Sequence, residues 1–196
     1  MPPLRVPAHL RTELPTAASA TRAATVVGCP PANTTVIETA THNADALVHN
    51  ATAYLAAHPF TSVTARYHAW FGVAPTFAQH SRVSTIFATM NDTSFTLHEY
   101  TCVPETQCAG LVTDAAYTTP WTPGRVFVCP KYFSRTATAQ AGLLVHLATQ
   151  WATVGDTGHW AIGEENSKSL ALRNPFLAVD NGDSFEYFAE NTPPLS

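Results

Sequence analysis

The stretch that decides the fold is residues 140–163, QAGLLVHLATQWATVGDTGHWAIG. Its first half is almost entirely apolar and places His146 and Gln150 one helical turn apart, which predicts a buried helix. Its second half carries several Gly and Thr residues and predicts a loop, in which His159 and Trp160 lie. The stretch therefore predicts a core helix, over roughly residues 137–152, that leads into a loop with polar side chains.

This helix departs from a known catalytic pattern at the positions that carry the chemistry. In the zinc-peptidase motif H-E-x-x-H, two imidazoles one turn apart bind the metal, and the Glu between them deprotonates the bound water. Here His146 keeps the first position, Leu147 stands at the Glu position and Gln150 stands at the second His. Leu cannot accept a proton, and a neutral amide is a poor zinc ligand. The sequence therefore predicts a helix of this type without its catalytic groups.

The composition excludes several classes of protein. The chain has 196 residues, 45% of them hydrophobic and only 12% charged, which suits one domain with a real core. Its net charge is −4 and its ten Lys and Arg residues are scattered, which argues against a nucleic-acid groove. No apolar run has the length of a membrane-spanning helix.

The four cysteines indicate an oxidising compartment. They form no C-x-x-C pair, and an even number at wide spacing favours two disulfides in a secreted protein. Three pairings of Cys29, Cys102, Cys108 and Cys129 are possible on the sequence alone. The chain shows no signal peptide, and we expect that one was removed. Asn33, Asn50 and Asn91 lie in N-glycosylation sequons and are candidates for modification.

Hydropathy patterns predict an α+β domain over residues 27–196, preceded by a Pro-rich tail or propeptide-like segment over 1–26. We expect helices over 34–58, 74–90, 137–152, 164–173 and 175–190. Short β-prone runs at 95–97, 111–112 and 125–128 predict a small antiparallel sheet that disulfides staple, because three of the cysteines lie in this region.

Several motifs occur in the order found in one family. Residues 67–72 read YHAWFG, residues 140–146 read QAGLLVH and residues 183–191 read DSFEYFAEN. In these segments the chain resembles the fungal peptidyl-Lys metalloendopeptidases, relatives of deuterolysin in the aspzincin group, from about Val27 to Pro193. The resemblance implies a zincin-like single domain, mostly helical, with disulfides Cys29–Cys102 and Cys108–Cys129.

The resemblance also implies what has happened to the catalytic centre. His146 matches the first zinc-binding His, and Asp183 matches a ligand Asp, whereas Gln150 and Leu147 replace the second His and the general base. In the family's G-T-x-D-x-x-Y-G segment, His159 takes the place of the Asp and Ile162 that of the Tyr. Loss of a general base alone costs about 10²–10⁴ in rate, and loss of an oxyanion donor a further factor of about 10²–10³. We therefore expect no peptide hydrolysis by the family's mechanism.

The surviving residues allow two interpretations. His146 and Asp183 could simply hydrogen-bond across the old cleft, with no cofactor. Alternatively, His146, His159 and Asp183 could form a two-His-one-carboxylate set that binds zinc or another transition metal. Glu164 could add a carboxylate to the cleft, although an acidic first helical turn is more simply explained by the helix dipole. Trp160 is the candidate for an altered cleft wall.

The sequence thus predicts a secreted, catalytically inactive metalloendopeptidase homologue that acts as a monomer and binds an unknown peptide or protein ligand through the old cleft or surface. The first alternative is a metal-binding protein or metalloenzyme with a rebuilt site at His146, His159 and Asp183. The second alternative is a secreted toxin, defence or lectin-like protein. We expect no nucleic-acid partner and no membrane association.

Overall fold

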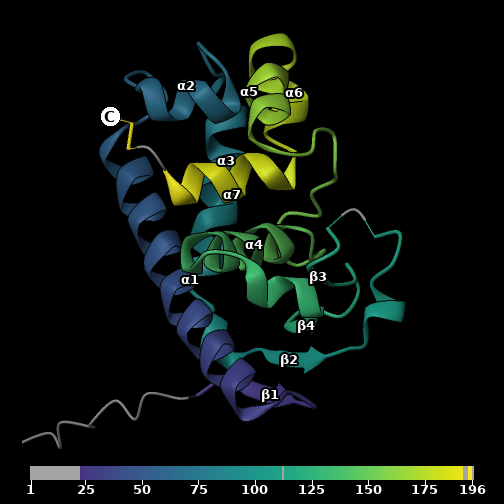
Figure 1. Ribbon diagram of the computed structural model, residues 1–196. Helices are drawn as coiled ribbons and strands as arrows, with labels where there is room; N and C mark the ends of the chain where they lie inside the picture. Colours follow the sequence, from purple (N-terminus) through teal and green to yellow (C-terminus); the bar gives the residue numbers. More distant parts are fainter. Residues whose placement is uncertain (1–22, 112, 192–193, 196) are drawn as a thin grey trace, which may run out of the picture.

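The computed structural model describes residues 23–111, 113–191 and 194–195. In chain order its elements are β1 (Thr25–Val27), α1 (Pro31–Ala57), α2 (Ala65–Phe71), α3 (Phe77–Asn91), η1 (Phe95–Leu97), β2 (Glu99–Cys102), η2 (Glu105–Gln107), β3 (Ala116–Tyr117), β4 (Arg125–Val128), η3 (Pro130–Ser134), α4 (Ala137–Thr149), α5 (Glu164–Arg173), α6 (Pro175–Ala178) and α7 (Gly182–Glu190). The helices gather around α4 and the small sheet lies at one end, below α4 in Figure 1.

The long helix α1 runs down one side of the molecule and packs against α3, α4 and α7 (Figure 1). Its buried face carries small and apolar side chains at helical spacing, among them Ala40, Ala44, Val48 and Ala51. Alanine at these positions lets the backbone of a neighbouring helix approach closely. The helix ends at Ala57. Pro59 disfavours helical backbone at the residue before it, which is His58.

Helix α4 lies at the centre of the core, between α1 and α7. Every side chain from Gln140 to Thr149 is buried, so this helix is enclosed on all sides rather than amphipathic. The hydroxyl of Thr136 caps its first turn by accepting a hydrogen bond from the N–H of Ala139 (3.3 Å). The prediction of a buried helix in this stretch is confirmed, and the helix ends at Thr149 rather than at residue 152.

The predicted fold class is confirmed, with a correction to the direction of the strands. The sheet has the order β1-β2-β4-β3, and β1–β2 and β2–β4 are parallel pairs. Only β3–β4 is antiparallel, so the sheet is mixed and the prediction of an antiparallel sheet is wrong for two of its three pairings. The physical reason is connectivity: β1 reaches β2 through α1, α2, α3 and η1, and β2 reaches β4 through η2 and β3. Connections of this length permit a parallel return.

Two disulfides tie the sheet to the rest of the chain as the family resemblance implies. Cys29 bonds to Cys102, which joins the start of α1 to the end of β2. Cys108 bonds to Cys129, which closes the loop that holds β3 and β4. Of the predicted strands, 125–128 is confirmed, whereas 95–97 forms the 3₁₀ helix η1 and residue 111 lies outside any strand. Residue 112 lies outside the described part of the chain.

The helix boundaries differ from the predictions where side chains override hydropathy. Helix α3 begins at Phe77, not at 74, because Thr76 and Gln79 form a reciprocal capping box. The predicted helix 175–190 is two helices, α6 and α7, separated at Asn181. Helix α5 has the predicted bounds 164–173, and α2 was not predicted.

The predicted division between residues 26 and 27 falls inside β1, because Thr25 and Val26 pair with β2. These two residues therefore belong to the folded domain. The rest of the predicted tail lies outside the described residues, except residues 23 and 24. The glycosylation candidates Asn33 and Asn50 lie on α1 and Asn91 ends α3, and modification stays a prediction.

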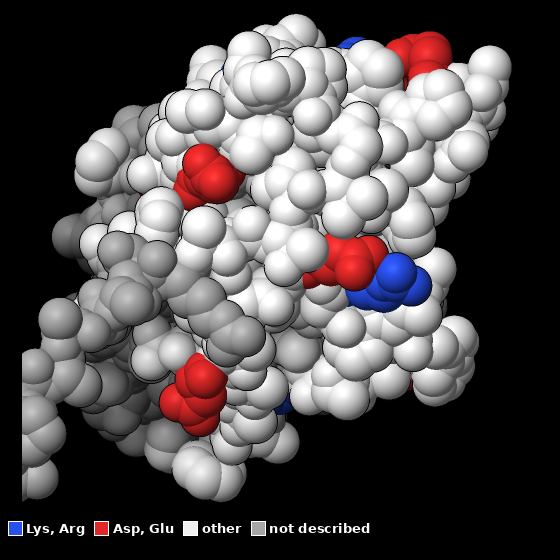
Figure 2. Space-filling view, turned by 90° about the horizontal axis from the view of Figure 1, so that it is seen from below, with Lys and Arg blue, Asp and Glu red and all other residues white. Residues whose placement is uncertain are grey.

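The surface is sparsely charged. Seen from the sheet end, the molecule shows scattered acidic groups and few basic ones on a largely uncharged face (Figure 2). No basic stripe of the kind that nucleic acids require is visible on this face. Within the described residues, no helix is both long enough and apolar enough to cross a membrane.

Candidate functional site

The candidate site lies where α4 meets the first turn of α7. His146 projects from α4, and its side chain is fully buried. The ring lies against Gly182, where a Cβ atom would stand 3.1 Å from the ring Cε1 and 3.2 Å from both ring nitrogens. Because Gly182 has no side chain, the first turn of α7 can pack directly against the imidazole of His146.

Two carboxylates of α7 face the buried imidazole. His146 Nδ1 lies 3.3 Å from Asp183 Oδ2 and 3.4 Å from Glu186 Oε2. Burial alone would lower the pKa of His146, but the two carboxylates outweigh burial and raise the pKa above its ordinary value. Arg135, whose guanidinium lies 3.5 Å from the other oxygen of Glu186, opposes this rise. The centre is thus a compact cluster of opposite charges.

Gln150 occupies the space between two imidazoles. Its amide nitrogen lies 2.7 Å from His146 Nε2 and 3.1 Å from His159 Nε2. The two rings stack, with centroids 5.1 Å apart and planes inclined by 29°. An amide NH₂ that donates to both Nε2 atoms requires both rings to carry their proton on Nδ1. If His146 takes up a second proton, the amide must turn to present its oxygen.

His159 is brought to this position by the loop that follows α4. The loop is fixed to the start of α7 by hydrogen bonds from Gly158 N–H to Asp180 O (2.9 Å), from Ala161 N–H to Asn181 Oδ1 (3.0 Å) and from Gly163 N–H to Asp183 Oδ1 (2.9 Å). Burial, and then the nearby His146, lower the pKa of His159 below its ordinary value. His159 is therefore held as a neutral imidazole at the mouth of the site.

The structure brings the three predicted metal ligands together. Ligand atoms of His146, His159 and Asp183 all lie within 4.8 Å of one another. Two imidazoles and one carboxylate are a donor set that zinc and other first-row metals accept. His146 Nδ1 and Asp183 Oδ2 face each other at 3.3 Å, and neither makes a hydrogen bond of acceptable geometry. The residues fit a metal, provided that the Gln150 amide turns out from between the rings.

The other predicted site residues fall on two sides of this cluster. Leu147 is buried in the core with 2% of its surface exposed. Trp160 and Ile162 are half exposed and, together with His159 and Arg173, line a surface cavity of about 320 Å³. Glu164 does not line this cavity; it accepts a hydrogen bond from Lys168 (2.7 Å) in the first turn of α5. The helix-dipole interpretation of Glu164 stays a prediction.

Sequence reasoning missed two members of the cluster. Glu186 stands three residues after Asp183, a spacing that places both carboxylates on one face of a helix, so the sequence did carry a signal for it. Arg135 precedes α4, and only the tertiary fold brings it to Glu186. No local sequence pattern indicates that Arg135 belongs to the cluster.

Comparison with known proteins gives a consistent result. Residues 54–190 match the aspzincin family, described as lysine-specific metallo-endopeptidases. A peptidyl-Lys metalloendopeptidase of Pleurotus ostreatus is 32% identical over 88% of this chain and 100% of its own length. That of Grifola frondosa is 34% identical over 90% of this chain, which spans 49% of the relative's length. A solved zinc peptidase from Grifola frondosa superimposes with a TM-score of 0.78 at 33% identity, covering 86% of this chain and all of that one.

Proposed function

Because the chain belongs to the aspzincin family of metalloendopeptidases, we propose that it is a secreted, non-hydrolysing member that binds a peptide or protein ligand at the surface around the old catalytic centre. Its two disulfides fit an extracellular protein, and a relative of 30% identity from Aeromonas hydrophila is named an extracellular protease. We propose that the chain acts as a monomer.

The observation that carries this proposal is the Gln150 amide between the imidazoles of His146 and His159. It fills the place where a second His would complete a metal site, and the neighbouring Leu147 offers no atom that could take a proton from water. The carboxylates of the cluster are already engaged: Asp183 accepts from Gly163 N–H, and Glu186 pairs with Arg135. The position that carries the general base in the H-E-x-x-H motif therefore holds a side chain that cannot accept a proton.

The cavity beside the cluster supplies the binding surface. Trp160 and Ile162 expose 54% and 51% of their surface there, and Asn166 and Arg173 add polar groups to the wall. Exposed aromatic and aliphatic side chains rimmed by polar ones are typical of a protein or peptide contact. The relatives are named for peptidyl-Lys substrates, so a lysine-containing peptide is the first ligand to test.

The absence of hydrolysis is tested by repairing the centre. The wild-type chain and the variant Leu147→Glu/Gln150→His/His159→Asp/Ile162→Tyr are incubated with a lysine-rich protein substrate and zinc, and new peptide ends are identified by mass spectrometry. We expect no cleavage above the blank by the wild type and zinc-dependent cleavage by the repaired variant. Specific cleavage by the wild-type chain that a chelator abolishes would refute the proposal.

Binding is tested separately by calorimetric titration of lysine-containing peptides, with the same peptides carrying Ala for Lys as the comparison. Trp160→Ala should weaken binding at least about tenfold, which corresponds to the loss of one well-packed aromatic contact. Trp121→Ala is the matched control, because Trp121 is 80% exposed and does not line the cavity. Equal weakening by both variants would place the ligand elsewhere.

A metal-binding function is the second candidate, favoured by the convergence of His146, His159 and Asp183. Zinc, when bound there, would supply a Lewis acid, with the two imidazoles and the carboxylate as its holders. Metal content of the purified protein, measured by elemental analysis, should be near one ion per chain and fall in His159→Ala if this candidate is correct. Gln150→Ala should then bind metal more tightly, since the amide no longer separates the imidazoles.

A further inference from the structure

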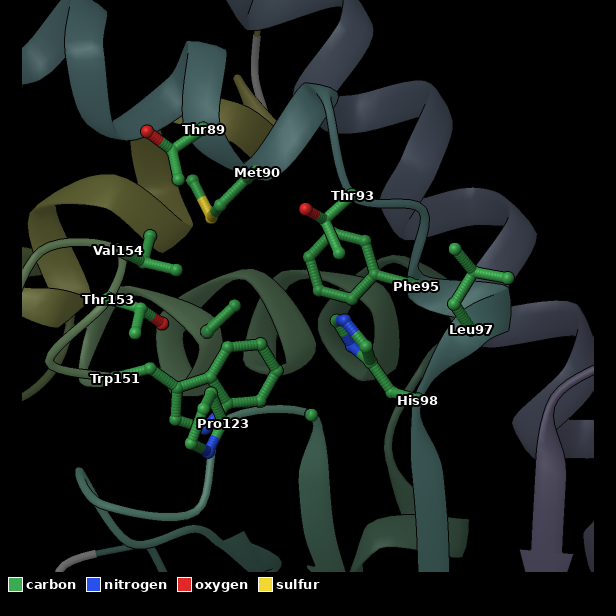
Figure 3. Close-up of a pocket in the computed structure, with 12 residues that line it drawn as sticks. Thr89, Met90, Thr93, Phe95, Leu97, His98, Pro123, Trp151, Thr153 and Val154 are labelled. Carbon is green, nitrogen blue, oxygen red and sulfur yellow. The ribbon is translucent and has the colours of Figure 1, made fainter.

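A second cavity, of about 370 Å³, lies away from the old catalytic centre and shares no lining residue with the cavity around His159. It is bounded by the end of α3, by η1, by the turn before β4 and by the end of α4 with the residues that follow it (Figure 3). This volume lies in the range of small-molecule sites in proteins. A cavity of this size is large enough to hold a small-molecule ligand.

The cavity has a buried apolar floor and an exposed rim. Met90, Phe95, Ala148 and Trp151 form the floor, each with no more than 3% of its surface exposed. The rim consists of residues open to solvent: Thr93, Leu97, Pro123 and Thr153. Figure 3 shows the rings of Trp151 and Phe95 at the opening, with the His98 ring in edge contact with both and Met90 above. A ligand that entered would therefore meet aromatic rings and a thioether, contacts that favour an aromatic body.

One polar side chain in this lining is buried and lacks a partner. His98 is 6% exposed, and its Nδ1 is buried without a hydrogen bond. Its ring makes edge contacts with Trp151 (centroids 4.8 Å apart) and Phe95 (5.6 Å). Burial lowers the pKa of His98, with only partial opposition from Asp45, so the imidazole is neutral and offers one donor and one acceptor. Nδ1 is closed to water while the cavity is empty, so a ligand reaches it only if the His98 ring turns. A ligand that turns the ring and bonds to this atom would recover the free energy that an unpartnered buried polar atom costs.

The neighbouring polar groups are already engaged and do not compete for this role. The indole N–H of Trp151 donates to Thr118 Oγ1 (2.7 Å). The carboxylate of Asp45 accepts hydrogen bonds from the hydroxyl of Ser94 (2.7 Å) and the N–H of Phe95 (2.8 Å). Among the lining residues none is Lys, Arg, Asp or Glu. An ionic ligand would lose its hydration without meeting a counter-charge, so the lining selects a neutral molecule.

We propose that this cavity is a binding site for a small neutral aromatic alcohol, a phenol or a compound of similar shape, whose ring lies between Trp151 and Phe95 and whose hydroxyl hydrogen-bonds to His98. The site is independent of the function proposed for the cluster around His146. It gives the chain a small-molecule ligand in addition to any peptide or metal.

The test uses three probes of nearly the same shape on the full chain: 4-ethylphenol, ethylbenzene, which lacks the hydroxyl, and 4-ethylbenzoate, which is charged. Calorimetry should give saturable binding of 4-ethylphenol with Kd on the order of 0.1–1 mM, as suits a ligand of about nine non-hydrogen atoms. Ethylbenzene should bind about tenfold more weakly, the value of one net hydrogen bond, and 4-ethylbenzoate should not saturate. The chain has only two methionines, so the methyl resonance of Met90 reports by NMR whether the probe enters this cavity.

Two variants and a control locate the site. Ala148→Leu fills the floor and should weaken 4-ethylphenol at least about tenfold. His98→Phe keeps the ring and removes the hydrogen bond, so 4-ethylphenol and ethylbenzene should bind equally. Ile162→Ala alters only the cavity near His159 and should change nothing. Circular dichroism shows whether each variant is folded, and if Ala148→Leu is not, His98→Phe and the Met90 resonance decide.

Any of the following results would overturn the proposal. The first is absence of saturable 4-ethylphenol binding by the folded wild type. The second is binding that leaves the Met90 methyl unshifted or that His98→Phe does not alter relative to ethylbenzene. The third is equal affinity for 4-ethylbenzoate. Loss of 4-ethylphenol binding in Ile162→Ala would likewise place the probe at the old centre and refute the second site.

Discussion

Two buried histidines lie in very different surroundings on either side of α4. His146 projects from α4 itself into a cluster of two carboxylates, an amide and a second imidazole. His98 lies between η1 and β2, among aromatic rings at the end of α4. Both are at least nine-tenths buried, yet the pKa of His146 is raised and that of His98 is lowered.

The difference teaches that partners, not burial, set the charge of a histidine in this molecule. Desolvation lowers the pKa of both rings. Two carboxylates within 3.4 Å reverse the effect at His146, whereas Asp45 only moderates it at His98. One region is therefore suited to hold a charge or a cation and the other to hold a neutral ligand.

The largest effect should come from removing Glu186, the carboxylate that pairs with Arg135 and faces His146. Glu186→Ala leaves both His146 and Arg135 without this partner, and loss of one partner from a buried charge cluster costs about 3–5 kcal/mol. Chemical denaturation measures the change. Glu99→Ala is the control, because its ion pair with Arg125 is more exposed and should cost less than about 1 kcal/mol. Equal losses would mean that the cluster adds nothing beyond a surface pair.

A smaller loss should follow from crowding His146. In Gly182→Ala the new methyl group meets the imidazole at 3.1–3.2 Å, and overpacking of this kind costs about 1–3 kcal/mol. The NMR signals of His146 should shift while those of His98 stay in place. Unchanged stability together with unchanged His146 signals would show that the close packing of α7 on α4 is not needed.

The aromatic side should respond more weakly still. Thr118→Val removes the oxygen that accepts from the Trp151 indole N–H and should cost about 1–2 kcal/mol by leaving a buried donor without its partner. Thermal unfolding followed by Trp fluorescence measures it. Thr153→Val, at the exposed rim of the same cavity, should leave the unfolding temperature unchanged.

The finest test is the dependence of stability on pH, which should have opposite signs for the two histidines. The raised pKa of His146 means that its contribution to stability is present below 6.5, the ordinary value, and is lost as pH rises through the raised value. The lowered pKa of His98 means that its contribution is present above 6.5 and is lost as pH falls through the lowered value. Denaturation midpoints of the wild type, His146→Gln and His98→Phe between pH 5 and 8 separate the two slopes. Slopes of the same sign would contradict the comparison.

The sequence predicted the region around His146 well because its signals are local. The apolar run of α4, the spacing that aligns His146 with Gln150 and the acidic start of α7 are all visible in short stretches. The replacements at 147, 150, 159 and 162 are read directly from the motif. The sequence did not predict the cavity around His98, because its lining comes from three separate segments of the chain, 89–98, 123–124 and 148–154, that only the fold brings together.

Other failures share this cause. The strands were expected to pair as antiparallel neighbours, but β2 pairs in parallel with β1 and β4, and such long-range pairings leave no local trace. The single helix expected over 175–190 is broken by Asn181, whose buried side chain bonds to Ser167 and Ser184 and to the loop that carries His159. Because of this break, α7 begins at Gly182, and Asp183 in its first turn faces His146.

The sequence by itself determined the family, the buried helix, the residues that stand at positions 147, 150, 159 and 162 of the motif and, through the resemblance, the two disulfide pairings. These properties depend on residue identity and on spacings of one or two helical turns, which a chain displays before it folds. Tertiary structure alone decided that Gln150 bridges the two imidazoles, that Arg135 and Glu186 join the cluster, and that His98 lies without a partner in a cavity. Each of these depends on atoms brought within a few ångströms from distant segments, and only packing brings them there.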